Sequence, residues 1–140
     1  YNGTLDKIIG DELMVLYGVP LKNENDCQNA VNSAIDMFKA LEVFNNKMKS
    51  EELPELGIGV GINFGKVVSG NIGSDQQMNY TVIGDNVNLA ARLCSSAKAG
   101  EIIISKSVFE KLTNKHEFTN RDPIMVKGKA LAIENWSFHS

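Results

Sequence analysis

Two short stretches carry polar side chains whose types and spacing could bind a metal ion and a phosphate. Lys7 and Asp11 flank Ile8-Ile9-Gly10 near the start of the chain, and Asn88 and Arg92 lie four positions apart. Residues four apart share one face of an α-helix. A carboxylate suits a hard divalent cation, which prefers oxygen ligands, whereas an arginine beside an asparagine suits a phosphate and a ribose oxygen.

The same residues also fit an ordinary structural interpretation. Asp11 is a typical turn residue, and Lys7 is a typical solvated strand lysine. Asn88 and Arg92 would then form the polar face of an amphipathic helix, with Thr81 on the strand that precedes it. Spacing alone leaves both interpretations open.

The apolar pattern predicts the elements that position these residues. Two short segments rich in apolar residues, 5–9 and 13–17, flank Gly10-Asp11-Glu12 and predict a β-hairpin with Asp11 at its turn. A short strand at 79–83 carries Thr81. Gly84 then breaks the pattern, and a helix over 87–97 carries Asn88 and Arg92.

The middle of the chain predicts a long helix and a glycine-rich strand. Apolar residues at three-four spacing indicate a one-sided helix, capped by Asn25 or Asp26 and running to about Met48. Alternation over 58–64 predicts a strand, and Gly65-Lys66 forms a turn before the apolar pattern resumes.

The last third predicts three more strands and one more helix. A strand at 102–104 precedes a helix that begins with the capping box Ser107-x-x-Glu110. The runs at 124–127 and 134–138 predict two final strands. The order β-β-α-β-β-α-β-α-β-β predicts an α+β fold in which helices pack on a sheet.

Composition limits the classes of protein. The chain has 140 residues, with 14 Lys+Arg and 17 Asp+Glu for a formal net charge of −3, which predicts a single domain over 1–140. No purely apolar run in the chain approaches the ~18 to 20 residues of a membrane span, and its scattered basic residues offer no nucleic-acid footprint. We therefore expect no direct membrane contact and no nucleic-acid partner.

Cysteine usage and the generic motifs exclude several further chemistries. Cys27 and Cys94 form no Cys-x-x-Cys motif, so a reduced, cytoplasmic setting is the default. The stretch 61–66 fails as a phosphate loop because its glycines are one position too close and Val67 replaces the required Ser or Thr. The stretch 57–62 lacks the third glycine of a dinucleotide fingerprint. His116 and His139 have no partners arranged as in a catalytic triad or a metal pair.

Four blocks of sequence resemble the class III nucleotidyl cyclase catalytic domain in order and spacing. They are GTLDKIIGD at 3–11, GVGINFGKVVSGNIG at 59–73, YTVIGDNVNLAARL at 80–93 and VKGK at 126–129. The resemblance implies a ferredoxin-like α+β core with helices on a mostly antiparallel sheet. It also implies a head-to-tail homodimer, because the nucleotide sites of this family lie between two subunits.

The resemblance implies a role for each polar residue at the expected site. Asp11 matches the second of two metal-binding aspartates, and Asn88 matches the residue that orients the ribose. Arg92 would stabilise charge on the α-phosphate in the transition state, and Lys127 would neutralise the outer phosphates. In the family's dimer the metal aspartates come from one subunit and the other groups from its partner.

The base-reading positions favour adenine. Lys7 and Thr81 match the pair that contacts the purine edge, and a lysine donor with a hydroxyl acceptor complements adenine's ring nitrogen and amine. Guanylyl members of the family carry Glu and Cys at these places, so Lys7 disfavours a guanylyl cyclase. Many adenylyl members carry Asp at the position of Thr81, and threonine there resembles a branch that includes bicarbonate-responsive cyclases.

The implied reaction converts ATP to 3′,5′-cyclic AMP and pyrophosphate. The ribose 3′-oxygen attacks the α-phosphorus in line, and two Mg²⁺ or Mn²⁺ ions would activate that oxygen and bind the leaving charge. Holding the ribose and phosphate in attack geometry can supply about 7 to 11 kcal/mol of the barrier.

The chain departs from the family pattern at its start. No Phe-x-Asp segment, which in the family supplies the first metal aspartate, is found in the sequence. We therefore expect a domain truncated at its N-terminus, lacking the first strand and helices, with little or no activity by itself. The intact protein would carry an upstream regulatory domain and could be membrane-anchored. The alternative is a non-catalytic cyclase-like module that pairs with or regulates another domain.

Overall fold

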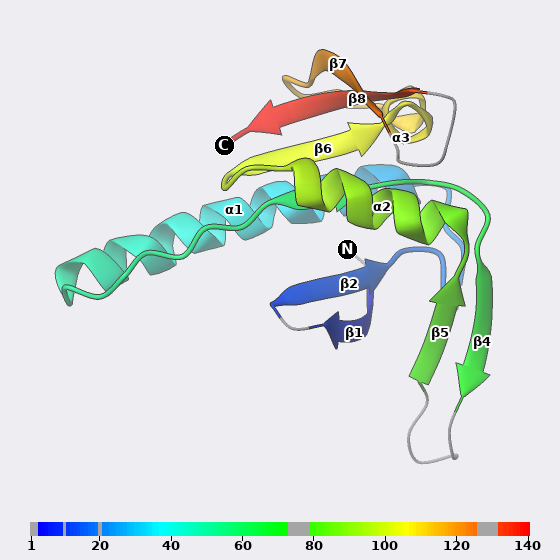
Figure 1. Cartoon of the computed structure of the whole chain (residues 1–140). Helices are drawn as coiled ribbons and strands as arrows, with labels where there is room; N and C mark the ends of the chain where they lie inside the picture. Colours follow the sequence, from blue (N-terminus) through cyan, green and yellow to red (C-terminus); the bar gives the residue numbers. More distant parts are fainter. Residues whose placement is uncertain (1–2, 10, 20, 73–78, 126–131) are drawn as a thin grey trace.

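A four-stranded mixed sheet with helices on both faces forms the centre of the fold (Figure 1). The computed structural model describes residues 3–9, 11–19, 21–72, 79–125 and 132–140; for 6, 7, 9, 68–72 and 79–83 only the backbone is described. The sheet order is β3-β6-β8-β7, with a parallel β3–β6 pair and antiparallel β6–β8 and β8–β7 pairs. Its strands are β3 (Val60–Ile62), β6 (Glu101–Ser105), β7 (Thr119–Met125) and β8 (Ala132–His139).

The main hydrophobic core lies between this sheet and two helices on one face. Helix α1 (Asp26–Ser50) contributes Val31 and Phe38, and helix α3 (Lys106–Lys111) contributes Val108. They pack against Ile102 and Ile104 of β6. Strand β6 is buried at all five positions, which explains why its sequence reads as a continuous apolar run rather than an alternating one.

Helix α2 (Asp85–Ser96) covers the opposite face of the sheet. Successive residues of a strand point to opposite faces of the sheet. Val60 and Ile62 therefore face α1, whereas Gly61 faces α2. A Cβ atom at Gly61 would lie 2.2 Å from the backbone nitrogen of Cys94. The bare glycine therefore allows the α2 backbone to lie directly on β3, and Leu93 is fully buried there.

Two β-hairpins stand outside the four-stranded sheet (Figure 1). Strands β1 (Thr4–Ile9) and β2 (Glu12–Leu16) pair antiparallel, with a bulge between Leu5 and Lys7. Strands β4 (Val68–Ile72) and β5 (Asn79–Ile83) form the second hairpin, in which Thr81 lies opposite Gly70. Strand β1 lies against β5, so the two hairpins are neighbours.

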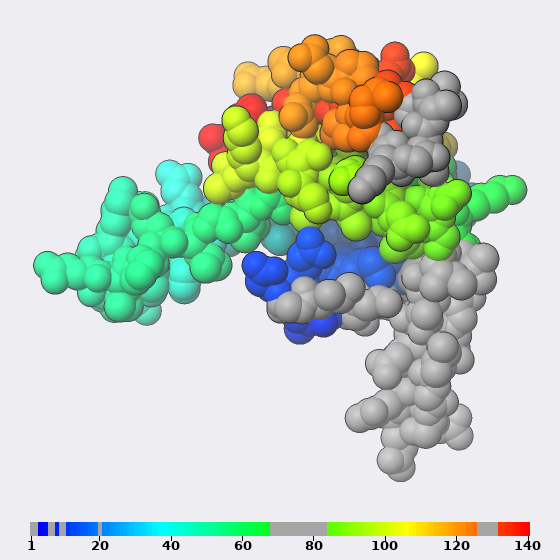
Figure 2. All heavy atoms as spheres, viewed as in Figure 1, coloured from blue at the N-terminus to red at the C-terminus, as the bar shows by residue number. Residues whose placement is uncertain are grey.

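Helix α1 extends well beyond the sheet, and its C-terminal half stands out from the body of the molecule (Figure 2). After the helix, the chain returns along it. The side chain of Asn45 holds that return, because its Nδ2 donates to the Leu56 carbonyl at 2.8 Å and its Oδ1 accepts from the Leu56 N–H at 2.7 Å.

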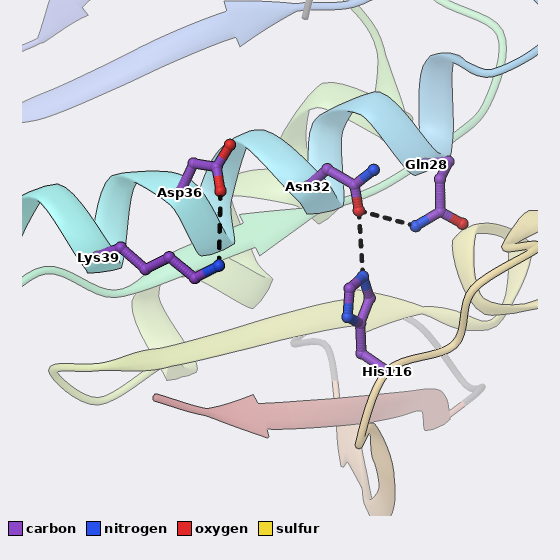
Figure 3. A network of polar contacts seen from close by, with 5 residues as sticks. All are labelled: Gln28, Asn32, Asp36, Lys39 and His116. Atoms are coloured by element: carbon purple, nitrogen blue, oxygen red, sulfur yellow. Dashed lines mark hydrogen bonds and ion pairs between the residues drawn. The ribbon is translucent and has the colours of Figure 1, made fainter.

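The N-terminal half of α1 is tied to the loop after α3 by a polar network (Figure 3). The Gln28 Oε1 accepts from the N–H groups of Thr113 and Asn114 at 3.0 and 2.9 Å. Both the Gln28 Nε2 and the His116 Nε2 approach the Oδ1 of Asn32, at 3.0 and 3.1 Å. These contacts give His116 a structural role, in agreement with the sequence-based interpretation.

The structure confirms the α+β fold and most of the predicted elements, and it corrects two details. The predicted capping box is wrong: α3 begins at Lys106 with Ser105 as its N-cap residue, and the Ser107 hydroxyl instead donates to the Phe64 carbonyl at 2.9 Å. The strand predicted over 58–64 is limited to β3, and the chain beyond Gly65-Lys66 begins the separate strand β4 in another hairpin. The observed order therefore contains one more strand.

The first of the two final strands also differs from its prediction. Strand β7 begins at Thr119 rather than near Ile124. Its register against β8 shifts between Arg121 and Ile124, around Pro123, so polar residues and a bulge obscure the period-two pattern. No helix among the described residues has the length and apolar character needed to cross a bilayer.

Both cysteines are free, and burial raises the pKa of each thiol. For Cys94 the nearby Glu12 carboxylate raises the pKa further, because negative charge disfavours the thiolate. A raised pKa leaves less of the reactive thiolate at neutral pH. We expect iodoacetamide to modify both cysteines more slowly in the native protein than in denaturant, as measured by mass spectrometry. Equal rates in the two states would contradict the packing described for α1 and α2.

Candidate active site

Helix α2 carries the two residues that the sequence analysis predicts to be catalytic. Asn88 and Arg92 are both exposed, whereas Leu93 on the opposite side is fully buried. The helix begins directly after Gly84, whose φ of 137° favours glycine. The N–H groups of Val87 and Asn88 each donate to the Gly84 carbonyl at 3.2 Å, so the sharp turn and the first helical hydrogen bonds determine where Asn88 lies.

Polar contacts among Asn63, Asn86 and the Lys66 carbonyl hold the first turn of α2. We call these three groups the α2 clasp. The Nδ2 of Asn63 donates to the backbone oxygen of Asn86 at 2.9 Å and to its Oδ1 at 3.2 Å. The Nδ2 of Asn86 in turn donates to the Lys66 carbonyl at 2.8 Å. The clasp joins α2 to the loop between β3 and β4.

The backbone brings the predicted base-reading positions near α2. Lys7 lies on β1 opposite Met14, and Thr81 lies on β5. Strand β1 lies against β5, and β5 lies against α2. The elements that carry Lys7, Thr81, Asn88 and Arg92 are therefore adjacent, although the side chains of Lys7 and Thr81, like the whole of Lys127, lie outside the described residues.

Asp11 lies in the turn between β1 and β2, where its side chain is exposed. Its carboxylate supplies the hard oxygen that Mg²⁺ or Mn²⁺ accepts, so Asp11 fits as one ligand of a metal ion. Among the residues that the structure describes, no group of three or more His, Cys, Asp or Glu side chains is placed to hold a metal. An ion held by Asp11 would thus complete its coordination mainly with water and phosphate oxygens.

A hollow of ≈ 580 Å³ opens beside the α2 clasp, at the ends of β3 and β6. Its lining includes Asn63, Asn86 and Leu89, but neither Asn88 nor Arg92. The two candidate catalytic side chains are therefore not part of this hollow. An exposed position is compatible with a site that a second subunit completes.

The second histidine has a structural partner, as the first does. The Nε2 of His139 lies 3.2 Å from the Oε2 of Glu101, a residue that is 4% exposed. The other oxygen of Glu101 accepts from the Lys98 N–H at 3.0 Å. His139 and Glu101 thus stabilise the turn between the end of α2 and the start of β6.

Sequence reasoning missed the clasp residues Asn63 and Asn86. They have no periodic spacing, and they bond to each other and to a backbone carbonyl about 20 residues away, which a sequence pattern does not reveal. The one available signal was the Gly65-Lys66 interruption of the predicted strand. A glycine at that point marks a place where another group approaches the backbone closely.

The family model for the adenylate and guanylate cyclase catalytic domain matches residues 6–140. The chain belongs to this family, the class III nucleotidyl cyclase catalytic domains. Members of the class generally use divalent metal ions and a nucleotide substrate, and they typically act as dimers.

The chain resembles both named adenylate cyclases and a named guanylyl cyclase. An adenylate cyclase from Anabaena cylindrica is 36% identical over 141 residues, which cover 94% of this chain and 27% of that protein. The structure of the guanylyl cyclase Cya2 matches with a TM-score of 0.87 at 35% identity, covering 96% of this chain and 68% of that one. The adenylyl cyclase CyaB from P. aeruginosa gives 0.83 at 33% identity, covering 96% and 70%.

These matches define the fold and the family of the chain. The chain has the α+β cyclase fold, with helices on a mixed sheet. It spans about a quarter of the length of the Anabaena relative.

Proposed function

We propose that the chain is the catalytic domain of an adenylate cyclase, which converts ATP to 3′,5′-cyclic AMP and pyrophosphate. The observation that carries this proposal is the pair Lys7 and Thr81, on the adjacent strands β1 and β5, of which β5 lies against α2. A lysine and a hydroxyl complement the ring nitrogen and amine of adenine, whereas the edge of guanine reverses both groups.

Two residues of α2 perform the positioning and the charge stabilisation. Asn88 holds the ribose so that its 3′-oxygen lies in line with the α-phosphorus, and Arg92 donates to the oxygens that gain charge in the transition state. Their spacing of four residues places them one helical turn apart on one exposed face. Lys127 neutralises the outer phosphates.

The metal ions belong to the same proposal. When bound, Mg²⁺ or Mn²⁺ lowers the pKa of the attacking hydroxyl and stabilises the leaving pyrophosphate. Asp11 provides one oxygen ligand for these ions. Its carboxylate lies in the β1–β2 turn and is exposed. The first metal aspartate of the family, which its Phe-x-Asp segment supplies, has no counterpart among the residues of the chain.

A homodimer supplies the remaining groups of each site. One apolar face of the β1–β2 hairpin is open to solvent in the single chain, with Leu5 57%, Ile8 65% and Leu13 59% exposed. Apolar surface of this kind marks a protein interface. We place the working protein in the cytoplasm, with an upstream domain that regulates it and no nucleic-acid partner.

The test uses the full-length product of the gene that encodes this chain, assayed with Mn²⁺ and either ATP or GTP. We expect cyclic AMP from ATP and at least about 100-fold lower kcat/KM for GTP, since a donor facing a donor in a closed site discriminates strongly. The combined variant Lys7→Glu and Thr81→Cys should reverse this preference. Cyclic GMP as the main wild-type product would assign a guanylyl cyclase, and no cyclisation of either nucleotide would assign a non-catalytic module.

A further inference from the structure

We propose that Asn63 and Asn86 are positioning residues that hold Asn88 and Arg92 in attack geometry. The proposal rests on the proposed cyclase activity and extends it, because neither residue contacts the reacting groups. The α2 clasp would fix the first turn of α2, and with it the face that carries the two catalytic side chains.

The α2 clasp lies where the β4–β5 hairpin meets helix α2. Lys66 stands two residues before β4, and Asn86 stands three residues after the end of β5. The hydrogen bond from the Asn86 Nδ2 to the Lys66 carbonyl therefore closes the base of the β4–β5 hairpin onto α2. Without it, the connection between the strand of Thr81 and the helix of Arg92 would depend more on the Gly84 turn, and glycine is the most flexible residue.

A third element anchors the clasp to the central sheet. The Ser107 hydroxyl donates to the Phe64 carbonyl at 2.9 Å and lies 3.4 Å from the Oδ1 of Asn63. Ser107 is the second residue of α3 and lies two positions after the end of β6. The loop that receives Asn86 is therefore itself held by the buried core of the domain.

The backbone at Gly65 is shaped to receive the Asn86 amide. A Cβ atom at Gly65 would lie 2.3 Å from both the Cγ and the Nδ2 of Asn86. The Asn86 amide is the end of a short side chain, so an alanine at 65 would displace it at little cost to the fold. Gly65→Ala thus disrupts the clasp without removing any of its polar atoms.

The experiment compares Asn86→Ala and Gly65→Ala in the full-length protein. A displacement of about 1 Å in a catalytic group can cost about 100-fold in rate, so we expect each variant to lower kcat for ATP about 10- to 100-fold with a much smaller change in KM. The hydrogen bond from Asn86 to Lys66 is exposed, and the melting temperature should change little.

The double variant tests whether the two substitutions act through one contact. Once Asn86 is alanine, the alanine at 65 has no amide to displace, so Gly65→Ala should have no further effect in that background. Asn45→Ala is the matched control, because it removes a similar side-chain clasp on the backbone of Leu56 and should leave kcat within about twofold of wild type. Wild-type kcat in Asn86→Ala, or effects that multiply in the double variant, would overturn the proposal.

Amide hydrogen exchange separates failure of this inference from failure of the proposed function. Exchange at residues 87–92 should be faster in Asn86→Ala than in the wild type and in Asn45→Ala, whether or not the protein cyclises ATP. Unchanged exchange in the first turn of α2 would overturn the clasp as a positioning device. A wild-type protein without cyclase activity would instead refute the proposed function.

Discussion

Arg92→Ala is expected to reduce kcat for ATP about 100- to 1000-fold while changing KM little. A single well-placed donor to the developing charge of a transition state is worth about 3 to 4 kcal/mol. Arg92 is exposed on α2, so its removal creates no cavity and leaves the fold intact. The measurement is steady-state formation of cyclic AMP with Mn²⁺ over a range of ATP concentrations.

Arg92→Lys separates charge from geometry in the same assay. Lysine keeps the positive charge but loses the planar fork that contacts two phosphate oxygens at once. We expect its kcat to lie between those of wild type and Arg92→Ala. Lys39→Ala, at an exposed cation on α1, should retain full activity. An Arg92→Ala protein that turns over ATP as fast as wild type would show that Arg92 has no part in the transition state.

Gly61→Ala is expected to destabilise the domain by about 3 kcal/mol and to lower its melting temperature by about 10 °C. A methyl group at this position would lie 2.2 Å from the Cys94 backbone nitrogen and 2.8 Å from the Ala90 carbonyl oxygen. Both are backbone atoms of α2, which cannot move unless the whole helix moves away from β3. Thermal unfolding followed by circular dichroism measures the loss.

Gly57→Ala provides the comparison for that substitution. Its methyl group would lie 2.8 Å from the Ala99 side chain, but both residues are exposed, and the loops that carry them can adjust. We expect a loss of about 1 kcal/mol or less. Equal destabilisation by the two substitutions would mean that the close approach of α2 to β3 does not limit stability. A displaced α2 should also reduce cyclase activity, since the same helix carries Asn88 and Arg92.

The sequence was sufficient to predict the elements whose apolar periodicity is strong. The three-four spacing of Val31, Ala34 and Phe38 predicted α1, and the one-sided pattern around Leu93 predicted α2, with Asn88 and Arg92 correctly placed on its exposed face. The hairpin around Asp11 followed from its turn residues. These features depend on local chemistry, which a sequence expresses directly.

The predictions that were wrong or missing concern features that depend on contacts between distant segments of the chain. Ser107 resembles a cap by its spacing to Glu110, but its hydroxyl bonds the Phe64 carbonyl 43 residues away. The alternation across Gly65 continues in the sequence although β3 and β4 belong to different sheets. The clasp of Asn63 and Asn86 is non-local in the same way, so only the folded chain reveals it.

The position of β6 has a consequence for how the chain folds as it is synthesised. Its three isoleucines pair with β3, about 40 residues earlier, and with β8, about 30 residues later. At the usual rate of translation, about 5 to 20 residues per second, the β8 partner follows β6 by several seconds. During that interval an isoleucine-rich strand leaves the ribosome with one edge unpaired, which exposes it to chaperone binding and to aggregation.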